Sequence, residues 1–165
     1  MTNCKKAMVK SCGTKKVRRS TAMLTKQIPS MGEAVVRVAK ILNGEIKQPK
    51  SFEQNGIYCL QSESEHLLYG GKSRNVGQRF KSHNYTDFKG IEHDGMLICS
   101  CKRDWDTTFM NANEKQYIQA IQIYAAMFGY TVTNKNKIYK GALNDLLKPS
   151  DWEVINAYLE SHKVA

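Results

Sequence analysis

The apolar residues of the chain are arranged in short segments of helical or alternating spacing, separated by polar turns. A capping box at Ser30-Met-Gly-Glu33 precedes apolar residues at helical spacing, which predicts a helix that ends near Asn43. Two apolar runs, at residues 56–61 and 66–70, are separated by the polar segment 62–65. This pattern predicts a β-hairpin.

Signals of the same kinds occur in the rest of the chain. Asn75 is placed to cap a short helix, and residues 96–102 have strand character. Asn111-Ala-Asn-Glu114 resembles the start of a long helix, which Gly129 is expected to end. A second capping box, Ser150-Asp-Trp-Glu153, predicts a C-terminal helix.

With a short strand expected at residues 130–133, helices and strands are mixed along the whole chain. This order predicts an α+β fold with a small, mostly antiparallel three-stranded sheet flanked by helices. An N-terminal basic arm at residues 1–28 and a helix with its linker at residues 29–54 precede this sheet. A C-terminal helical extension at residues 135–165 follows it.

Charge is concentrated at the N-terminus. Residues 1–30 hold eight basic side chains and no acidic one, which leaves 17 basic and 15 acidic residues in the rest of the chain. Basic arms commonly bind phosphate backbones. We therefore expect nucleic-acid contacts from Lys15, Lys16, Arg18 and Arg19, although a passive solubilising tail would have the same composition.

Several protein classes are not expected. No apolar run reaches the roughly 18 residues that a membrane span needs. We expect no membrane partner and a cytoplasmic location, in a bacterial or phage-infected cell. The cysteines lack the paired spacing of zinc sites, and the segment Gly70-Gly71-Lys72-Ser73 lacks the upstream glycine of a nucleotide-binding loop.

One ordered set of residues is suited to phosphodiester cleavage. Gly56-Ile57-Tyr58 is followed after ten residues by Tyr69-Gly70-Gly71-Lys72, then by Arg79, His83 and Glu114. Arginine can offset charge on a phosphate, a carboxylate can hold a metal ion, and a tyrosine can take a proton from water.

This spacing resembles that of the GIY-YIG nuclease family over residues 55–134, which would form the nuclease core. Arg79 follows Gly71 by eight residues and His83 follows Arg79 by four, as the family pattern expects. Gly70 departs from the pattern, since the family usually has Ile or Val there. That side chain would be structural, so the departure does not imply a loss of activity.

The resemblance implies a metal-dependent DNA endonuclease with a role for each matched residue. Glu114 would hold one Mg²⁺ or Mn²⁺ ion, and Arg79 would contact the scissile phosphate. Tyr58 would be the general base, with Lys72 as the cation that favours its phenolate, although Tyr69 competes for the role of base. Tyr69 and His83 would orient water or phosphate. Asn134, or alternatively Asn136, would be a further polar residue that contacts nucleic acid.

Other interpretations stay open at this point. Glu114 could be only the capping glutamate of its own helix. The chain could be a nucleic-acid-binding module without catalysis. It could also be a nuclease of the repair or toxin type, which cuts branched DNA or cuts DNA without sequence specificity. Among endonucleases, a restriction enzyme and a phage or mobile-element nuclease fit equally well. A restriction enzyme that cuts both strands would be expected to form a homodimer.

Overall fold

The computed structural model describes residues 28–84, 86–102 and 105–162 of the chain. The four basic residues expected to bind nucleic acid lie outside the described residues. They are Lys15, Lys16, Arg18 and Arg19.

The described residues form four α-helices, one 3₁₀ helix and a four-stranded sheet. The helices are α2 (Met31–Leu42), α3 (Val76–His83), α4 (Thr107–Phe128), the 3₁₀ helix η1 (Leu143–Leu146) and α5 (Pro149–Ser161). The strands are β1 (Gly56–Ser62), β2 (Leu67–Ser73), β3 (Asp94–Ser100) and β4 (Thr131–Val132).

The strand order in the sheet is β3-β1-β2-β4. The pairs β1–β2 and β1–β3 are antiparallel, as expected, but β4 adds a short parallel pair on β2. The expected α+β class is confirmed, whereas the sheet has four strands and not three. The fourth strand is only two residues long, and its pairing depends on the return of the chain after α4.

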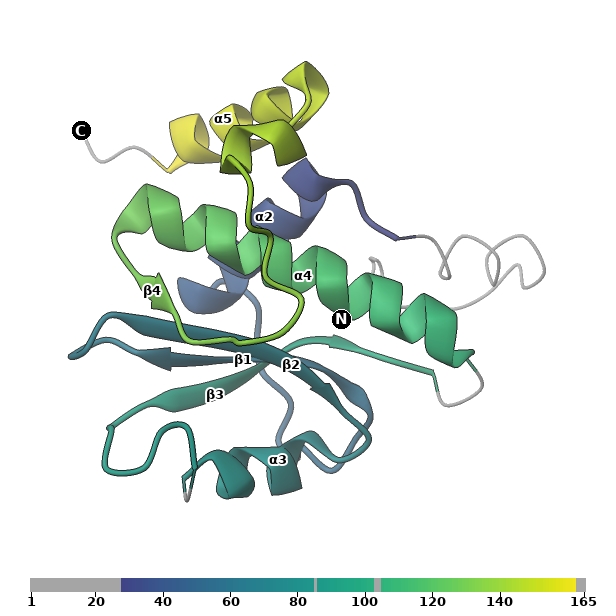
Figure 1. The fold of residues 1–165 in the computed structure, drawn as a ribbon, viewed down its shortest axis with the longest axis vertical. Helices are drawn as coiled ribbons and strands as arrows, with labels where there is room; N and C mark the ends of the chain where they lie inside the picture. Colours follow the sequence, from purple (N-terminus) through teal and green to yellow (C-terminus); the bar gives the residue numbers. More distant parts are fainter. Residues whose placement is uncertain (1–27, 85, 103–104, 163–165) are drawn as a thin grey trace.

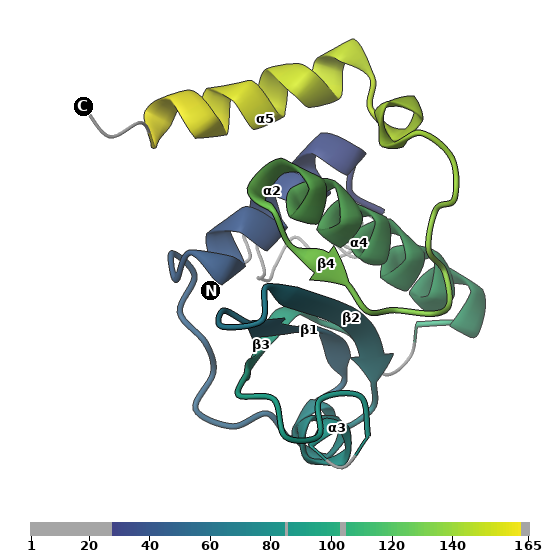
Figure 2. The ribbon, with the colours of Figure 1, turned by 60° about the vertical axis from the view of Figure 1, so that its left-hand side comes forward.

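The elements are stacked in layers (Figures 1 and 2). Helix α3 covers one face of the sheet, and α2 and α4 cover the other face, with α5 outermost. Each face has its own hydrophobic core, because side chains alternate between the faces along each strand. Ile57 and Cys59 of β1 belong to the core under α2 and α4, while Tyr58 and Leu60 belong to the core beside α3.

Local signals place three helix ends where the sequence predicts them. Ser30 and Glu33 form a reciprocal capping box at the start of α2, and Asn43 is its C-cap. The Asn75 side chain accepts a hydrogen bond from the Gln78 N–H at the start of α3. Gly129 ends α4 with a φ of 82°, in the left-handed region that favours glycine.

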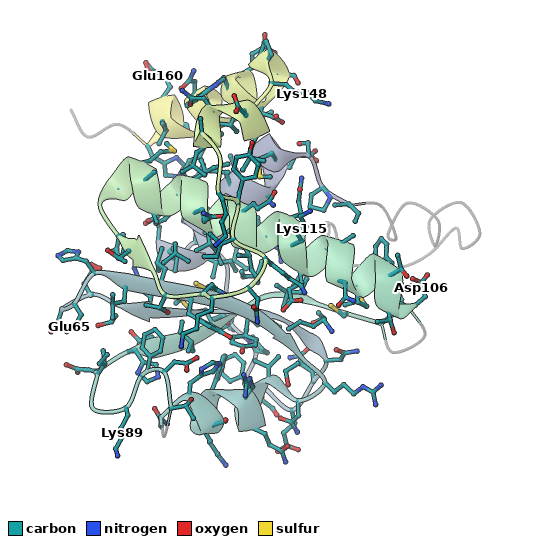
Figure 3. All side chains as sticks on the ribbon, in the orientation of Figure 1. Glu65, Lys89, Asp106, Lys115, Lys148 and Glu160 are labelled. Carbon is teal, nitrogen blue, oxygen red and sulfur yellow. The ribbon has the colours of Figure 1, made fainter. Side chains whose placement is uncertain are left out.

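Two predicted helix starts are wrong. Helix α4 begins at Thr107, because the Asp106 carboxylate caps it by accepting from the Phe109 N–H at 2.7 Å. Figure 3 shows Asp106 at this end of the helix. Glu114 therefore lies inside α4, and the interpretation that it caps its own helix is wrong as well.

Helix α5 begins at Pro149, before the predicted capping box. Proline suits the first position of a helix, since its missing N–H has no partner there. The Asp151 carboxylate accepts from the backbone N–H groups of Lys148 at 2.8 Å and Gly32 at 3.0 Å. This buried carboxylate thus caps α5 and ties it to the start of α2.

Side chains bond to the outer backbone at both sides of the sheet. The Gln48 amide donates to the Leu97 carbonyl at 3.2 Å and accepts from the Leu97 N–H at 2.7 Å. Arg37 Nε donates to the neighbouring Ile98 carbonyl at 2.7 Å. On the opposite side, the Asn134 amide makes the same double contact with Gly70, at 2.9 and 2.7 Å. We call these contacts the edge clamps.

None of the helices in the described ranges is long and apolar enough to cross a bilayer.

Gly70 is explained by the close packing of α4 on β2. A Cβ atom at this position would lie 2.6 Å from Ile121 Cδ1 and 3.4 Å from Ile118 Cγ1. Ile121 is fully buried, so it has little room to move. Ile118 and Ile121 of α4 therefore fill the space that an isoleucine or valine side chain at position 70 would need.

We expect Gly70→Val to lower the free energy of unfolding by about 1–3 kcal/mol through overpacking. Ile121→Val removes the clashing Cδ1 methyl and alone should cost about 0.5–1.5 kcal/mol. In the double variant the two losses should sum to less than their separate values, as measured by urea unfolding. Strictly additive losses would contradict this explanation of Gly70.

Candidate active site

The candidate residues on the sheet come together by register and alternation. Tyr58 pairs with Gly71 and Leu60 pairs with Tyr69, so both tyrosines lie on the face that α3 covers. Their ring centroids are 6.3 Å apart. Helix α3 packs on this face and contributes Arg79 and His83, which are one helical turn apart.

The Tyr58 hydroxyl is enclosed by its neighbours. Tyr58 is 1% exposed, and a Cβ atom on Gly71 would lie 2.6 Å from its hydroxyl oxygen. Only glycine leaves this space free. Burial, together with the neighbouring Tyr69, raises the pKa of Tyr58 above its ordinary value, and Arg79 opposes this shift. Tyr58 is therefore a neutral phenol at neutral pH.

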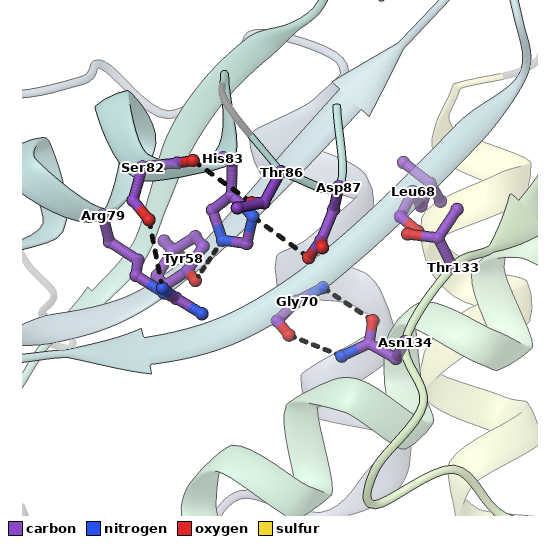
Figure 4. Close-up of polar contacts among 10 residues, drawn as sticks. All are labelled: Tyr58, Leu68, Gly70, Arg79, Ser82, His83, Thr86, Asp87, Thr133 and Asn134. Atoms are coloured by element: carbon purple, nitrogen blue, oxygen red, sulfur yellow. Dashed lines mark hydrogen bonds and ion pairs between the residues drawn. The ribbon is translucent and has the colours of Figure 1, made fainter. Parts of the chain in front are cut away.

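His83 is the hydrogen-bond partner of that phenol. Its Nε2 atom lies 2.8 Å from the Tyr58 hydroxyl oxygen, and its side chain is fully buried (Figure 4). Burial lowers the pKa of His83, as does Arg79, while Asp87 opposes them. A neutral imidazole can accept a proton at one nitrogen. The structure thus places His83 against the Tyr58 hydroxyl, and its predicted contact with water or phosphate stays a prediction.

Arg79 lies at the solvent side of the same cluster. Its guanidinium interacts with the hydroxyls of Tyr58 and Tyr69, and its Nη1 atom lies 3.4 Å from Ser82 Oγ. Partial burial lowers the pKa of Arg79, but both tyrosines outweigh it and raise the pKa. The guanidinium is exposed and permanently charged, so it can also donate a hydrogen bond to a phosphate oxygen.

Lys72 is not placed where its predicted role requires. It pairs with Ile57, whose side chain lies in the core under α4, so Lys72 shares that face and Tyr58 has the opposite one. The hydrogen bond with Cys99 raises the pKa of Cys101. The charge of Glu114 adds to this shift, and the charge of Lys72 opposes it. Lys72 therefore projects from the α4 face of β2, and the side chain that contacts the Tyr58 hydroxyl is His83.

Glu114 projects from α4 with 14% of its side chain exposed, and it forms an ion pair with Lys137 at 3.7 Å. Its charge also helps to raise the pKa of Tyr58. Glu114 and Tyr69 line one open groove of about 500 Å³ together with Asp87 and the 133–137 segment. The groove brings the candidate metal ligand and one candidate tyrosine to a common surface.

The segment after β4 contains residues with a different role from the predicted one and residues that were not predicted. Both polar atoms of the Asn134 side chain are bonded to Gly70, so its role in the structure is an edge clamp; contact with nucleic acid stays a prediction. Lys137, with a φ of 64°, was not predicted, because its pairing with Glu114 is long-range.

Glu114 fits a hard divalent cation as a single carboxylate ligand. Lys137 already neutralises it, so this position accepts positive charge. Among residues 28–84, 86–102 and 105–162, no group of three or more His, Cys, Asp or Glu side chains could hold a metal. Mg²⁺ suits such a place, because it often binds one or two carboxylates and completes its shell with waters and substrate phosphates.

Comparison with known proteins adds one finding. Residues 54–124 match the family model described as the GIY-YIG catalytic domain. The matched segment holds Tyr58, Tyr69, Arg79, His83 and Glu114, whereas Asn134 and Lys137 lie beyond it. No curated protein and no solved structure matches the chain.

Proposed function

We propose, from the premise that residues 54–124 are a GIY-YIG catalytic domain and so indicate a nuclease, that this chain is a divalent-metal-dependent endonuclease acting on double-stranded DNA. The observation that carries the proposal is the pair formed by the Tyr58 hydroxyl and His83 Nε2, 2.8 Å apart. Arg79 lies beside this pair, so a proton acceptor, a phenol and a cation that can contact a phosphate are brought together.

The Tyr58–His83 pair removes an obstacle to base catalysis. A phenol of raised pKa holds its proton at neutral pH, so it cannot act as a base alone. Neutral His83 can take that proton on Nε2 while Tyr58 takes a proton from the attacking water. The water oxygen bonds to phosphorus, the phosphorus–oxygen bond to the leaving group breaks, and the leaving oxygen gains a proton from solvent. His83 later returns its proton to solvent.

The other residues would bind and orient the phosphate. Arg79 would donate to its non-bridging oxygens and offset the charge that develops there. Tyr69, which is partly exposed and lines the groove, would hold the water or phosphate by hydrogen bonding. A divalent ion on Glu114, Mg²⁺ or Mn²⁺, would supply Lewis-acid stabilisation of the leaving oxygen when bound.

The experiment that tests the proposal is cleavage of supercoiled plasmid with Mg²⁺, with Mn²⁺ or with EDTA. Metal-dependent cutting is expected, and Arg79→Ala should slow it by about 10²–10³-fold, the usual loss for one preorganised donor. Lys81→Ala is the matched control, since Lys81 is an exposed cation on the same helix. Its rate should stay close to that of the unmodified protein.

Other outcomes would select the rival functions. DNA binding without cutting of plasmid or branched DNA, at any metal concentration, would contradict catalysis and favour a binding module. Cutting of branched DNA alone would favour a repair-type nuclease. Discrete bands would favour a restriction enzyme, which we expect to act as a homodimer, and a smear would favour an unspecific nuclease.

A further inference from the structure

In the proposed mechanism a proton passes from Tyr58 to His83 Nε2, and the second ring nitrogen of His83 also has a charged neighbour. His83 Nδ1 is buried and makes no hydrogen bond within the part of the chain that the structure describes, but it lies 3.3 Å from a carboxylate oxygen of Asp87, an ion-pair distance (Figure 4). His83 is fully buried, whereas 45% of the Asp87 side chain is exposed. The carboxylate therefore reaches inward from the surface to a buried nitrogen.

The backbone holds Asp87 in this place. The N–H groups on either side of it, those of Thr86 and Phe88, both donate to the His83 carbonyl, at 3.2 and 3.0 Å. The Thr86 hydroxyl donates to the Ser82 carbonyl at 3.1 Å, and the Phe88 ring is buried in the core beside α3. These hydrogen bonds hold the backbone on both sides of Asp87 against the end of α3.

An acidic side chain at position 87 disfavours the binding of a phosphate in the groove. Asp87 lines the groove that also holds Tyr69 and Glu114, where a phosphodiester would bind under the proposed function. A negative charge there repels phosphate and lowers affinity for DNA. The position is understandable if the carboxylate serves His83.

We propose that Asp87 is a positioning residue: its carboxylate keeps the proton of neutral His83 on Nδ1, which leaves the Nε2 lone pair directed at the Tyr58 hydroxyl. The inference rests on the proposed function. With the opposite tautomer, Nε2 would carry a hydrogen and could not accept the tyrosine proton. Asp87 does not touch the reacting atoms. It fixes which nitrogen of His83 is the acceptor.

The test combines the tautomer of His83 with the kinetics of cleavage. In the ¹⁵N-labelled protein, long-range ¹H–¹⁵N spectra should show His83 with a protonated Nδ1 and an unprotonated Nε2, and a His83→Gln sample identifies its signals. In Asp87→Ala the Nε2-protonated tautomer should appear. The turnover rate of Asp87→Ala and of Asp87→Asn should fall roughly 10²-fold, with no rise in KM for DNA. Asp87→Glu should recover part of the rate.

The pH profile provides a second measurement. The charged and titratable groups around His83 are Arg79, Asp87, His93, Tyr58 and Tyr69. Cleavage needs neutral His83, so the rate falls as pH drops through its pKa. Asp87 holds that pKa up against burial. Asp87→Ala should therefore move the acid limb to lower pH, and Glu92→Gln, which removes an exposed charge from the same connection, should not.

Three results would overturn the inference. One is an unchanged His83 tautomer together with an unchanged rate in Asp87→Ala. Another is a rise in the Mg²⁺ concentration needed for half-maximal rate, because that would make Asp87 a metal ligand. The third is a loss of rate that Asp87→Glu does not recover at all. If the unmodified protein cuts no DNA, the proposed function fails, and the tautomer spectra still decide whether Asp87 positions His83.

Discussion

Glu114→Gln is expected to lower the rate of metal-dependent cleavage by at least about 10²–10³-fold, while DNA binding persists. Removing one electrostatic contact to the transition state costs about 10²–10³, and Glu114 is the single carboxylate proposed to hold the ion. The Glu114 side chain is mostly buried, and glutamine has nearly the same shape. The variant should therefore fold as the unmodified protein does. Lys137 would lose its partner but stay partly exposed.

Cleavage should be measured over a Mg²⁺ titration, with Glu53→Gln as the control, since Glu53 is exposed and away from the groove. A rate for Glu114→Gln that recovers fully at high Mg²⁺ would mean only weakened binding of the ion. Undiminished cleavage at all concentrations would remove the role of Glu114 as metal ligand.

The second large effect is expected at Tyr58. Tyr58→Phe removes the hydroxyl that accepts the proton of water, and we expect a loss of about 10²–10⁴-fold in turnover. Tyr69→Phe should lose much less, because the Tyr69 ring contacts His83 only through an edge contact at 4.6 Å between centroids. The pair of variants decides which tyrosine is the base.

Tyr58→Phe also leaves His83 Nε2 without its partner, which costs about 1–3 kcal/mol when the group is buried. Thermal unfolding must therefore accompany the kinetics, so that lost activity is not confused with lost fold. A larger loss in Tyr69→Phe than in Tyr58→Phe, with both proteins folded, would reverse the assignment and would also remove the relay through His83.

Local signals predict well those elements that depend on neighbouring residues. The capping box at Ser30 and the cap at Asn75 act within three residues, and both form as predicted. The start of α4 was missed because Asn111 and Asn113 resemble caps, yet both lie inside the helix. Asparagine favours caps only when the backbone before it leaves the helix, and Asp106 had already started this one.

Alternation along one strand already indicates that Lys72 and Tyr69 do not share a face. Tyr69 and Lys72 are three positions apart on one strand, so their side chains must lie on opposite faces. A residue that supports the tyrosines had to come from another element. Asp87 and Lys137 could not be found in this way, because their partners, His83 and Glu114, depend on how a turn and a loop fold back.

The edge clamps have a consequence for self-association. A bare sheet edge invites a strand of another molecule to pair with it, and proteins that stay apart blunt such edges. Here Gln48 and Asn134 bond to outward backbone groups that an incoming strand would need. A homodimer of this protein would therefore meet through helices or loops, and a sheet continuous across two copies is disfavoured.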